Sequence, residues 1–182
     1  RYATITDRLA DLGGEKWQLH SLGRQRKAEG HDVIEMTIGE PDVPTPLELI
    51  EVASAAMFAG RTGYSNGRGE AALLKVLATY YSALADRPIT EDQILCFPGT
   101  QTALYAALMG LTDAGDEVLV GDPMYATYGG LIAASGATLV PVPLRPERNY
   151  EMSADDIAAR VSSKTRVILL NSPHNPTGSV LT

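Results

Sequence analysis

Three short segments carry side chains whose types and spacing could do chemistry. The first, residues 98–101, leads straight into a stretch with helical periodicity. Backbone N–H groups at a helix start attract anions, and Gly99 would let an anion approach the backbone closely. Thr100 adds a hydroxyl and Gln101 an amide. The segment is therefore a candidate anion site; the alternative is a plain turn in which Thr100 is the N-cap.

The second and third segments offer an aromatic ring and an amide. In residues 122–125, Tyr125 could stack against a flat ring. Alternatively, Tyr125 and Tyr128 are half-buried residues of the following helix. Residues 171–178 contain two prolines and a glycine, which restrict the backbone. Asn175 is placed there to offer its amide to a ligand oxygen, although turn chemistry alone would also explain the segment.

The order of the predicted elements would bring the three segments to one edge of a sheet. From residue 93 onward, strand-like runs (93–97, 117–121, 137–142, 165–170) alternate with helix-like stretches (101–112, 124–135, 154–161). This alternation predicts right-handed βαβ units and a parallel sheet, and such sheets bind ligands at the carboxyl ends of their strands. Together the segments suit a ligand with a phosphate, an aromatic ring and a ring oxygen. Pyridoxal 5'-phosphate (PLP) is such a ligand.

The chain upstream of residue 93 is expected to be mostly helical. Helices are predicted over residues 15–29 and 70–84, with a strand at 33–38. A further helix is expected to begin at Thr45 as N-cap and to end near Ala59. Pro46 suits its first position, and Glu48, three residues after Thr45, would complete a capping box.

Composition excludes several classes of protein. The 182 residues carry a net charge of -7 and show no basic stripe, so no nucleic-acid partner is expected. No apolar run approaches the ~20 residues of a membrane span. The single cysteine, Cys96, rules out a disulfide within the chain and fits a reducing, cytoplasmic location; we interpret it as a buried strand residue, with a catalytic thiol as the alternative. No His, Cys or carboxylate cluster has metal-ligand spacing.

The expected fold class is α/β, a three-layer αβα arrangement around a mainly parallel sheet. Parallel sheets are normally covered on both faces, and the predicted helices leave that cover unfinished. We therefore expect the natural chain to continue beyond Thr182, with the fold incomplete at this C-terminus.

From about Ile34 to Gly178 the chain resembles the class I/II aminotransferases of the fold-type-I PLP-dependent enzymes. Asn175-Pro176-Thr177-Gly178 is the most specific of the matching motifs. The others occur in the family's order: Gly39-Glu40-Pro41-Asp42, Tyr64-Ser65-Asn66-Gly67 with Leu73 and Leu74, Gly99-Thr100-Gln101-Thr102-Ala103-Leu104, Gly115-Asp116-Glu117-Val118 and Asp122-Pro123-Met124-Tyr125.

The resemblance implies a role for each matching residue. Gly99, Thr100 and Gln101 would hold the phosphate of PLP. Tyr125 would stack on the pyridine ring, and Asn175 would hydrogen-bond the ring hydroxyl oxygen. The Asp122–Pro123 and Asn175–Pro176 bonds are expected to be cis.

Further roles implied by the resemblance concern the substrate and a second subunit. Gly39 would contact the α-carboxylate of the substrate, while Tyr64 would reach the phosphate of the neighbouring subunit in a homodimer. Trp17 could help select the substrate side chain or could pack against a second domain. The implied domains are residues 1–44, an arm with part of the small domain, and residues 45–182, the first part of the large PLP-binding domain.

The resemblance also implies groups that these 182 residues do not supply. In the family a lysine binds PLP, an aspartate pairs with the pyridine nitrogen and an arginine holds the α-carboxylate. The lysines of this chain are Lys16, Lys27, Lys75 and Lys164, and none of them follows the expected motif. No catalytic residue is therefore assigned here, and the chain alone is expected to be inactive.

The expected activity of the complete protein is transfer of an amino group between an L-amino acid and a 2-oxo acid. Three alternatives stay open at this point. A PLP-dependent carbon–sulfur lyase would share every motif. An aminotransferase-like sensor domain of a transcription regulator would need a basic DNA-binding region. A dinucleotide-binding domain would use the glycines of residues 67–69, but that fingerprint requires a strand before it.

Overall fold

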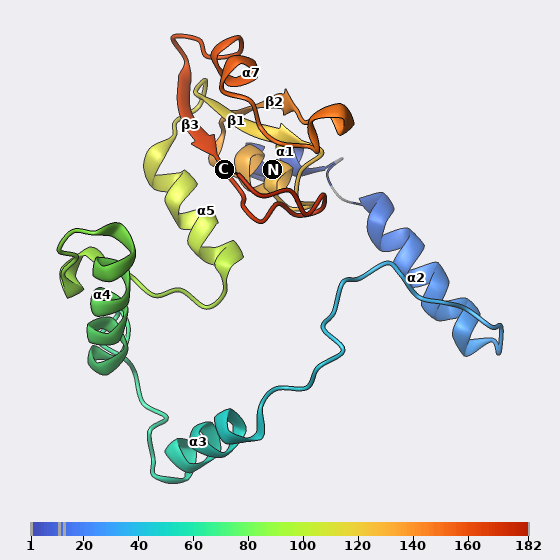
Figure 1. Ribbon diagram of the computed structural model, residues 1–182. Helices are drawn as coiled ribbons and strands as arrows, with labels where there is room; N and C mark the ends of the chain where they lie inside the picture. The colour runs from blue at the N-terminus through green and yellow to red at the C-terminus, as the bar shows by residue number, and fades with distance from the viewer. Residues whose placement is uncertain (1, 11, 13, 182) are drawn as a thin grey trace. The chain divides into compact units, whose positions relative to one another are not determined.

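The computed structural model describes residues 2–10, 12 and 14–181 (Figure 1). Two compact units divide the chain: residues 1–35 together with 99–182 form the first, and residues 36–98 form the second. This division does not test the predicted domain boundary after residue 44, which stays a prediction. The two units are described separately.

A three-stranded parallel sheet is the centre of the first unit. Its strands are β1 (Glu117–Asp122), β2 (Thr138–Pro143) and β3 (Thr165–Leu169), in the order β2-β1-β3. The apolar run of β1 is buried from both sides, because Val118 and Leu119 are 0% exposed. The predicted parallel α/β arrangement is thereby confirmed.

Helices lie on both sides of this sheet. Helix α5 (Thr100–Leu111) and helix α6 (Tyr128–Ser135) bury Leu108, Leu131 and Ile132 in one cluster with Val118 and Val120. In the view of Figure 1, α5 lies on one side of the strands and α7 (Ala154–Ala158) on the other. Helices therefore flank the sheet on two sides.

The opposite face is closed by the chain that follows β2. Leu119 is fully buried on this face, and a Cβ added at Gly121 would lie 2.9 Å from Leu144 Cδ1 and 3.0 Å from Met152 Cε. The small size of Gly121 thus lets these side chains approach the carboxyl end of β1. Ser153 is the N-cap of helix α7, and its Oγ accepts a hydrogen bond from Asp155 N.

Two helices precede the sheet in the first unit, α1 (Thr4–Leu9) and α2 (Gly14–Ala28). Arg8 of α1 donates from Nε to Ala133 O (2.9 Å) and from Nη2 to Ala134 O (3.3 Å). These carbonyls lie in the last turn of α6, where unpaired carbonyls attract a cation. Arg8 therefore joins α1 to the C-terminus of α6.

The second unit contains α3 (Leu47–Phe58), α4 (Ala71–Ala85) and the short 3-10 helix η1 (Glu91–Gln93). Leu74 and Ala78 of α4 are buried, whereas α3 has no buried residue. The predicted capping box at Thr45 is wrong, because Pro46 is the N-cap of α3 and no side chain caps it. The box forms instead between Thr90 and Gln93.

Two predicted strands are not strands in the structure. Residues 93–97 form the end of η1 and an extended stretch, tied by one backbone hydrogen bond from Cys96 N to Arg68 O (2.8 Å). Cys96 is only half-buried, so its interpretation as a buried strand residue is wrong as well. Residues 33–38 are likewise irregular. An apolar run becomes a strand only when another strand pairs with it, and no described strand pairs with either segment.

Candidate functional site

The first turn of α5 is open. Its N-cap is Gly99, at φ 88° and ψ 151°, and no side chain caps the helix. Thr100 is therefore the first helical residue and not the N-cap. A Cβ added at Gly99 would meet no atom within 4 Å, yet the positive φ would strain any residue other than glycine. The start of α5 thus combines an open approach with a backbone geometry that favours glycine.

The orientation of α5 determines where this start lies. At its other end, Leu111 O accepts a hydrogen bond of 3.2 Å from Arg166 Nε, at the beginning of β3. The 12 residues of α5 span about 18 Å, close to the length of about 20 Å of the six-residue β1. Because α5 ends where the strands begin, its N-terminus lies at the edge where they end.

Tyr125 follows β1 at this edge. Its ring contacts the ring of Tyr128 edge-on, with centroids 5.5 Å apart and planes at 67°. Tyr128 is 8% exposed and Tyr125 39%. Burial, followed by the neighbouring Tyr125, raises the pKa of Tyr128, so its phenol stays protonated. Helix α6 begins at Tyr128, four residues later than predicted, because residues 123–127 form a turn.

The loop after β3 is held by short hydrogen bonds. His174 N donates to Ser179 O and Gly178 N donates to His174 O, both at 2.7 Å. His174 is 9% exposed, whereas Asn175 at the loop tip is exposed. The Asp122–Pro123 and Asn175–Pro176 bonds are cis as predicted, and Ser172–Pro173 is cis too. The loop therefore presents Asn175 from a buried base.

A small cavity lies between the carboxyl ends of β1 and β3 and the loop. Its volume is about 10 Å³, which holds roughly one water molecule. The polar side chains among its lining residues are Tyr128, Tyr150, Asn171, His174 and Ser179. Since β1 and β3 are parallel, Tyr125 and Asn175 follow strand ends on one edge, the edge reached by the start of α5.

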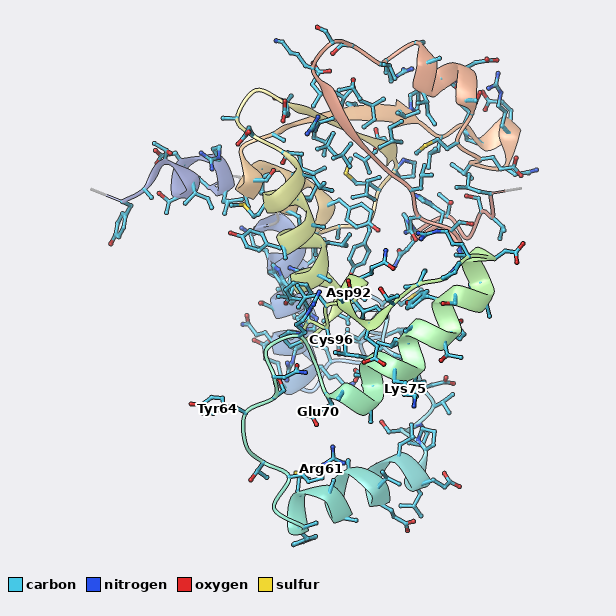
Figure 2. All side chains as sticks on the ribbon, turned by 90° about the vertical axis from the view of Figure 1, so that its left-hand side faces the viewer. Arg61, Tyr64, Glu70, Lys75, Asp92 and Cys96 are labelled. Carbon is cyan, nitrogen blue, oxygen red and sulfur yellow. The ribbon has the colours of Figure 1, made fainter. Side chains whose placement is uncertain are left out.

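The other predicted site residues lie elsewhere in the chain. Trp17 belongs to α2 and is 64% exposed. Gly39 and Tyr64 belong to the second unit, where Tyr64 is fully exposed and points away from the ribbon (Figure 2). Nearby, Arg61 Nη2 and Glu70 Oε2 form an ion pair of 3.4 Å that flanks the Tyr64 segment. The binding roles of all eight predicted residues stay predictions.

Lys164 lies at the opposite edge of the sheet. Its carbonyl accepts a hydrogen bond of 2.9 Å from Glu117 N, at the beginning of β1. Residues 162–164 are exposed and directly precede β3. Lys164 is therefore remote from the edge that carries Tyr125 and Asn175.

Three residues at this edge were not assigned a site role from the sequence. Ser179 Oγ donates a hydrogen bond to Tyr150 O (3.1 Å), which ties the loop after β3 to Tyr150. Thr127 Oγ1 is buried and has no hydrogen-bond partner among the described residues. Thr127 could have been found from the sequence, because it is a polar residue close to Tyr125. Nothing in the sequence links Ser179 to Tyr150.

Comparison with known proteins gives consistent matches. The family described as aminotransferase class I and II matches residues 31–182. The arginine–pyruvate transaminase AruH of Pseudomonas aeruginosa is 36% identical over 181 residues, which cover 100% of this chain and 46% of that protein. An aspartate aminotransferase of Thermotoga maritima is 36% identical over 177 residues, 97% of this chain and 47% of that protein.

Solved structures show the same similarity in three dimensions. The crystal structure of an aspartate aminotransferase from Rhizobium meliloti has a TM-score of 0.91 at 27% identity, covering 100% of this chain and 45% of that one. That of the Thermotoga maritima aspartate aminotransferase has a TM-score of 0.86 at 32% identity, covering 93% and 45%. The chain spans about half the length of the relatives it matches.

Proposed function

The chain belongs to the aminotransferase class I and II family, and from this premise we propose that the complete protein transfers an amino group between an L-amino acid and a 2-oxo acid. Proteins of this family depend on PLP. When bound, PLP supplies an electron sink for the charge that develops at the substrate α-carbon. The residues of this chain would bind and orient the cofactor.

The start of α5 fits the phosphate group. The open first turn, the positive φ of Gly99 and the free space at its Cβ position allow an anion to approach the backbone. The N-terminal end of a helix attracts negative charge. Thr100 and Gln101 would complete the phosphate site with their side chains. This open helix start, at the same sheet edge as Tyr125 and Asn175, is the observation that carries the proposal.

Tyr125 and Asn175 would orient the ring of PLP. Tyr125 is partly exposed and is contacted edge-on by Tyr128, an arrangement that braces the ring of Tyr125 from the side. A pyridine ring would stack on its face. Asn175, exposed at the tip of its loop, would donate its amide to the ring hydroxyl oxygen. Both contacts would fix the ring relative to the phosphate.

Substrate binding and assembly form the second part of the proposal. Gly39 would contact the substrate α-carboxylate, and Trp17 would border its side chain. Tyr64 would bind the phosphate of a neighbouring subunit in a homodimer. The full exposure of Tyr64 supports this, as does the exposure of apolar side chains on α3, among them Phe58 at 93%. A cytoplasmic location is proposed from the single cysteine.

Neither a membrane-spanning helix nor a metal site is part of the proposal. No helix of the described residues is long and apolar enough to cross a bilayer. Within the same residues, no group of three His, Cys, Asp or Glu side chains could hold a metal ion.

The proposed function is tested on the complete protein with PLP. A panel of L-amino acids is incubated with pyruvate or 2-oxoglutarate, and both products are quantified. Equimolar formation of a new amino acid and a new 2-oxo acid supports the proposal. Release of ammonia with cleavage of a carbon–sulfur bond, without a new amino acid, would replace it with the lyase. The matched variant Asn175→Ala should weaken PLP binding about tenfold, as expected for loss of one hydrogen bond.

A further inference from the structure

His174 lies at the base of the loop that presents Asn175. Both of its backbone polar groups are bonded within the loop, His174 N to Ser179 O and His174 O to Gly178 N. Its side chain is 9% exposed, whereas the adjacent Asn175 is open to solvent. His174 therefore anchors the loop, whereas Asn175 is exposed on it.

Side-chain hydrogen bonds connect His174, Thr177 and Ser179 with Tyr150 O, and the donor in each of them can be identified by starting at Tyr150 O. Ser179 Oγ lies 3.1 Å from Tyr150 O, and because a carbonyl only accepts, Ser179 donates its proton there. The contact of 3.1 Å between Thr177 Oγ1 and Ser179 Oγ must then use the proton of Thr177. Ser179 N also points to Thr177 Oγ1, at 3.4 Å, with the oxygen as acceptor.

The donor in the contact between His174 and Thr177 is fixed in the same way. His174 Nδ1 lies 2.8 Å from Thr177 Oγ1, whose proton is already used. Nδ1 must therefore carry a hydrogen and donate it to Thr177. Burial lowers the pKa of His174 below its usual value, so the ring is neutral near pH 7. A neutral ring with a hydrogen on Nδ1 leaves Nε2 as an acceptor.

We propose that His174 is a positioning residue whose Nδ1–H tautomer holds Thr177, and through Thr177 the loop tip that presents Asn175 to the cofactor. The proposal rests on the proposed function for the role of Asn175, but the tautomer and its bond to Thr177 do not. His174 itself does not act on the substrate, because its ring is buried and its Nδ1 is occupied within the loop.

The tautomer is tested by nitrogen NMR on the complete protein without cofactor, labelled at histidine nitrogens. The signal that disappears in His174→Asn identifies the residue. A neutral ring at pH 7.5 with the hydrogen on Nδ1 is the expected result. A hydrogen on Nε2, or a doubly protonated ring, would overturn the inference whether or not the protein is a transaminase.

Two substitutions separate positioning from general stability. The amide nitrogen of Asn lies near the position of Nδ1, and that of Gln near Nε2, so His174→Asn keeps a donor for Thr177 and His174→Gln does not. The PLP dissociation constant should stay within about threefold of wild type for His174→Asn and rise about five- to tenfold for His174→Gln, the range for one neutral hydrogen bond. Equal losses in both variants would contradict the proposal.

A change in protein stability alone does not shift the absorption band of bound PLP, so this band reports on the position of Asn175. Asn175 would touch the ring hydroxyl oxygen, so Asn175→Ala and His174→Gln should shift this band in the same direction. Val142→Ala, a core variant at a fully buried position of β2, should lower the melting temperature without the shift. A shift in Val142→Ala equal to that in His174→Gln would overturn the role.

The link between His174 and Thr177 is tested by a double-mutant cycle. Thr177→Val removes the hydroxyl while keeping the side-chain volume, and Thr177→Ser is the matched control that keeps it. If one bond connects the two residues, His174→Gln combined with Thr177→Val should weaken PLP binding no more than either single change. Additive losses would contradict the link. Failure of the wild-type protein to bind PLP would instead contradict the proposed function.

Discussion

The rings of Tyr125 and Tyr128 meet edge to face, with centroids 5.5 Å apart. Tyr128 is the buried member and belongs to the core cluster formed with Leu131 and Ile132. Tyr125 is thereby fixed from the side by a residue that the core itself holds in place. A stacking residue benefits from such support, because little conformational freedom is left to lose when a ligand binds.

Tyr125→Ala should weaken PLP binding about tenfold, since an aromatic pair contributes ~0.5–1.5 kcal/mol beyond area burial. Tyr125→Phe keeps the ring and should stay within about twofold of wild type. The measurement is the PLP dissociation constant of the complete protein, obtained by fluorescence titration. If Phe lost as much affinity as Ala, the hydroxyl and not the ring of Tyr125 would be the binding group.

Gly99→Ala should lower stability and weaken PLP binding together. At φ 88° and ψ 151°, a region that essentially only glycine occupies, a side chain is strained by roughly 1–3 kcal/mol, even though the space around the site is open. The matched control is Gly110→Ala in the same helix, where an added Cβ also meets nothing within 4 Å and φ is not positive. That change should stabilise the protein by up to about 1 kcal/mol through helix propensity.

Urea unfolding of both glycine variants, with and without PLP, checks these expectations. A PLP-dependent gain in stability that is smaller in Gly99→Ala than in Gly110→Ala agrees with a phosphate site at the start of α5. Identical gains in the two variants would place the phosphate elsewhere.

The sheet could be predicted from the sequence because its strands are short apolar runs that also find partners. Residues 117–121 and 165–170 were expected as strands, and β1 and β3 pair there. Residues 93–97 have the same pattern but no described strand pairs with them, and pairing is a tertiary property that local periodicity does not contain. Likewise, the capping-box pattern at Thr45 is as good as the one at Thr90, and only the latter forms.

The candidate site could be predicted only as a set of segments. The order of strands and helices places the loops containing Thr100, Tyr125 and Asn175 after predicted strands, and parallel pairing brings strand ends to one edge. The proposed role of His174 could not be predicted, because the direction of its hydrogen bond depends on Ser179 and on Tyr150, 24 residues upstream of His174. Such long-range contacts follow from the folded chain alone.

His174 should make stability depend on pH in a defined direction. Burial lowers the pKa of His174 in the folded protein below the value of 6.5 expected when it is unfolded. As the pH falls below 6.5, the unfolded chain takes up the proton first, so stability is lost until the pH passes the folded pKa. Above 6.5 this contribution is fully present. Tyr128 lines the same cavity, and burial raises its pKa, so its phenol stays protonated in this range.

The measurement is the free energy of unfolding of wild type and His174→Asn between pH 5 and 8. The wild type should lose more stability than the variant below pH 6.5, and the two curves should run parallel above it. A larger loss in His174→Asn would mean that the folded protein favours the charged ring, against the effect of burial.

Lys164→Met should leave transamination by the complete protein within about twofold of wild type, the range expected of an exposed change away from the site. Lys164 precedes β3, at the edge opposite to Tyr125 and Asn175, and cannot reach a ligand bound between them. Residues 1–182 alone should likewise produce no new amino acid. Both are measured with the same coupled assay, using the complete wild-type protein as positive control. Turnover by residues 1–182 that Lys164→Met abolishes would assign the catalytic amine to Lys164 and contradict the location of the site at the carboxyl edge of the sheet.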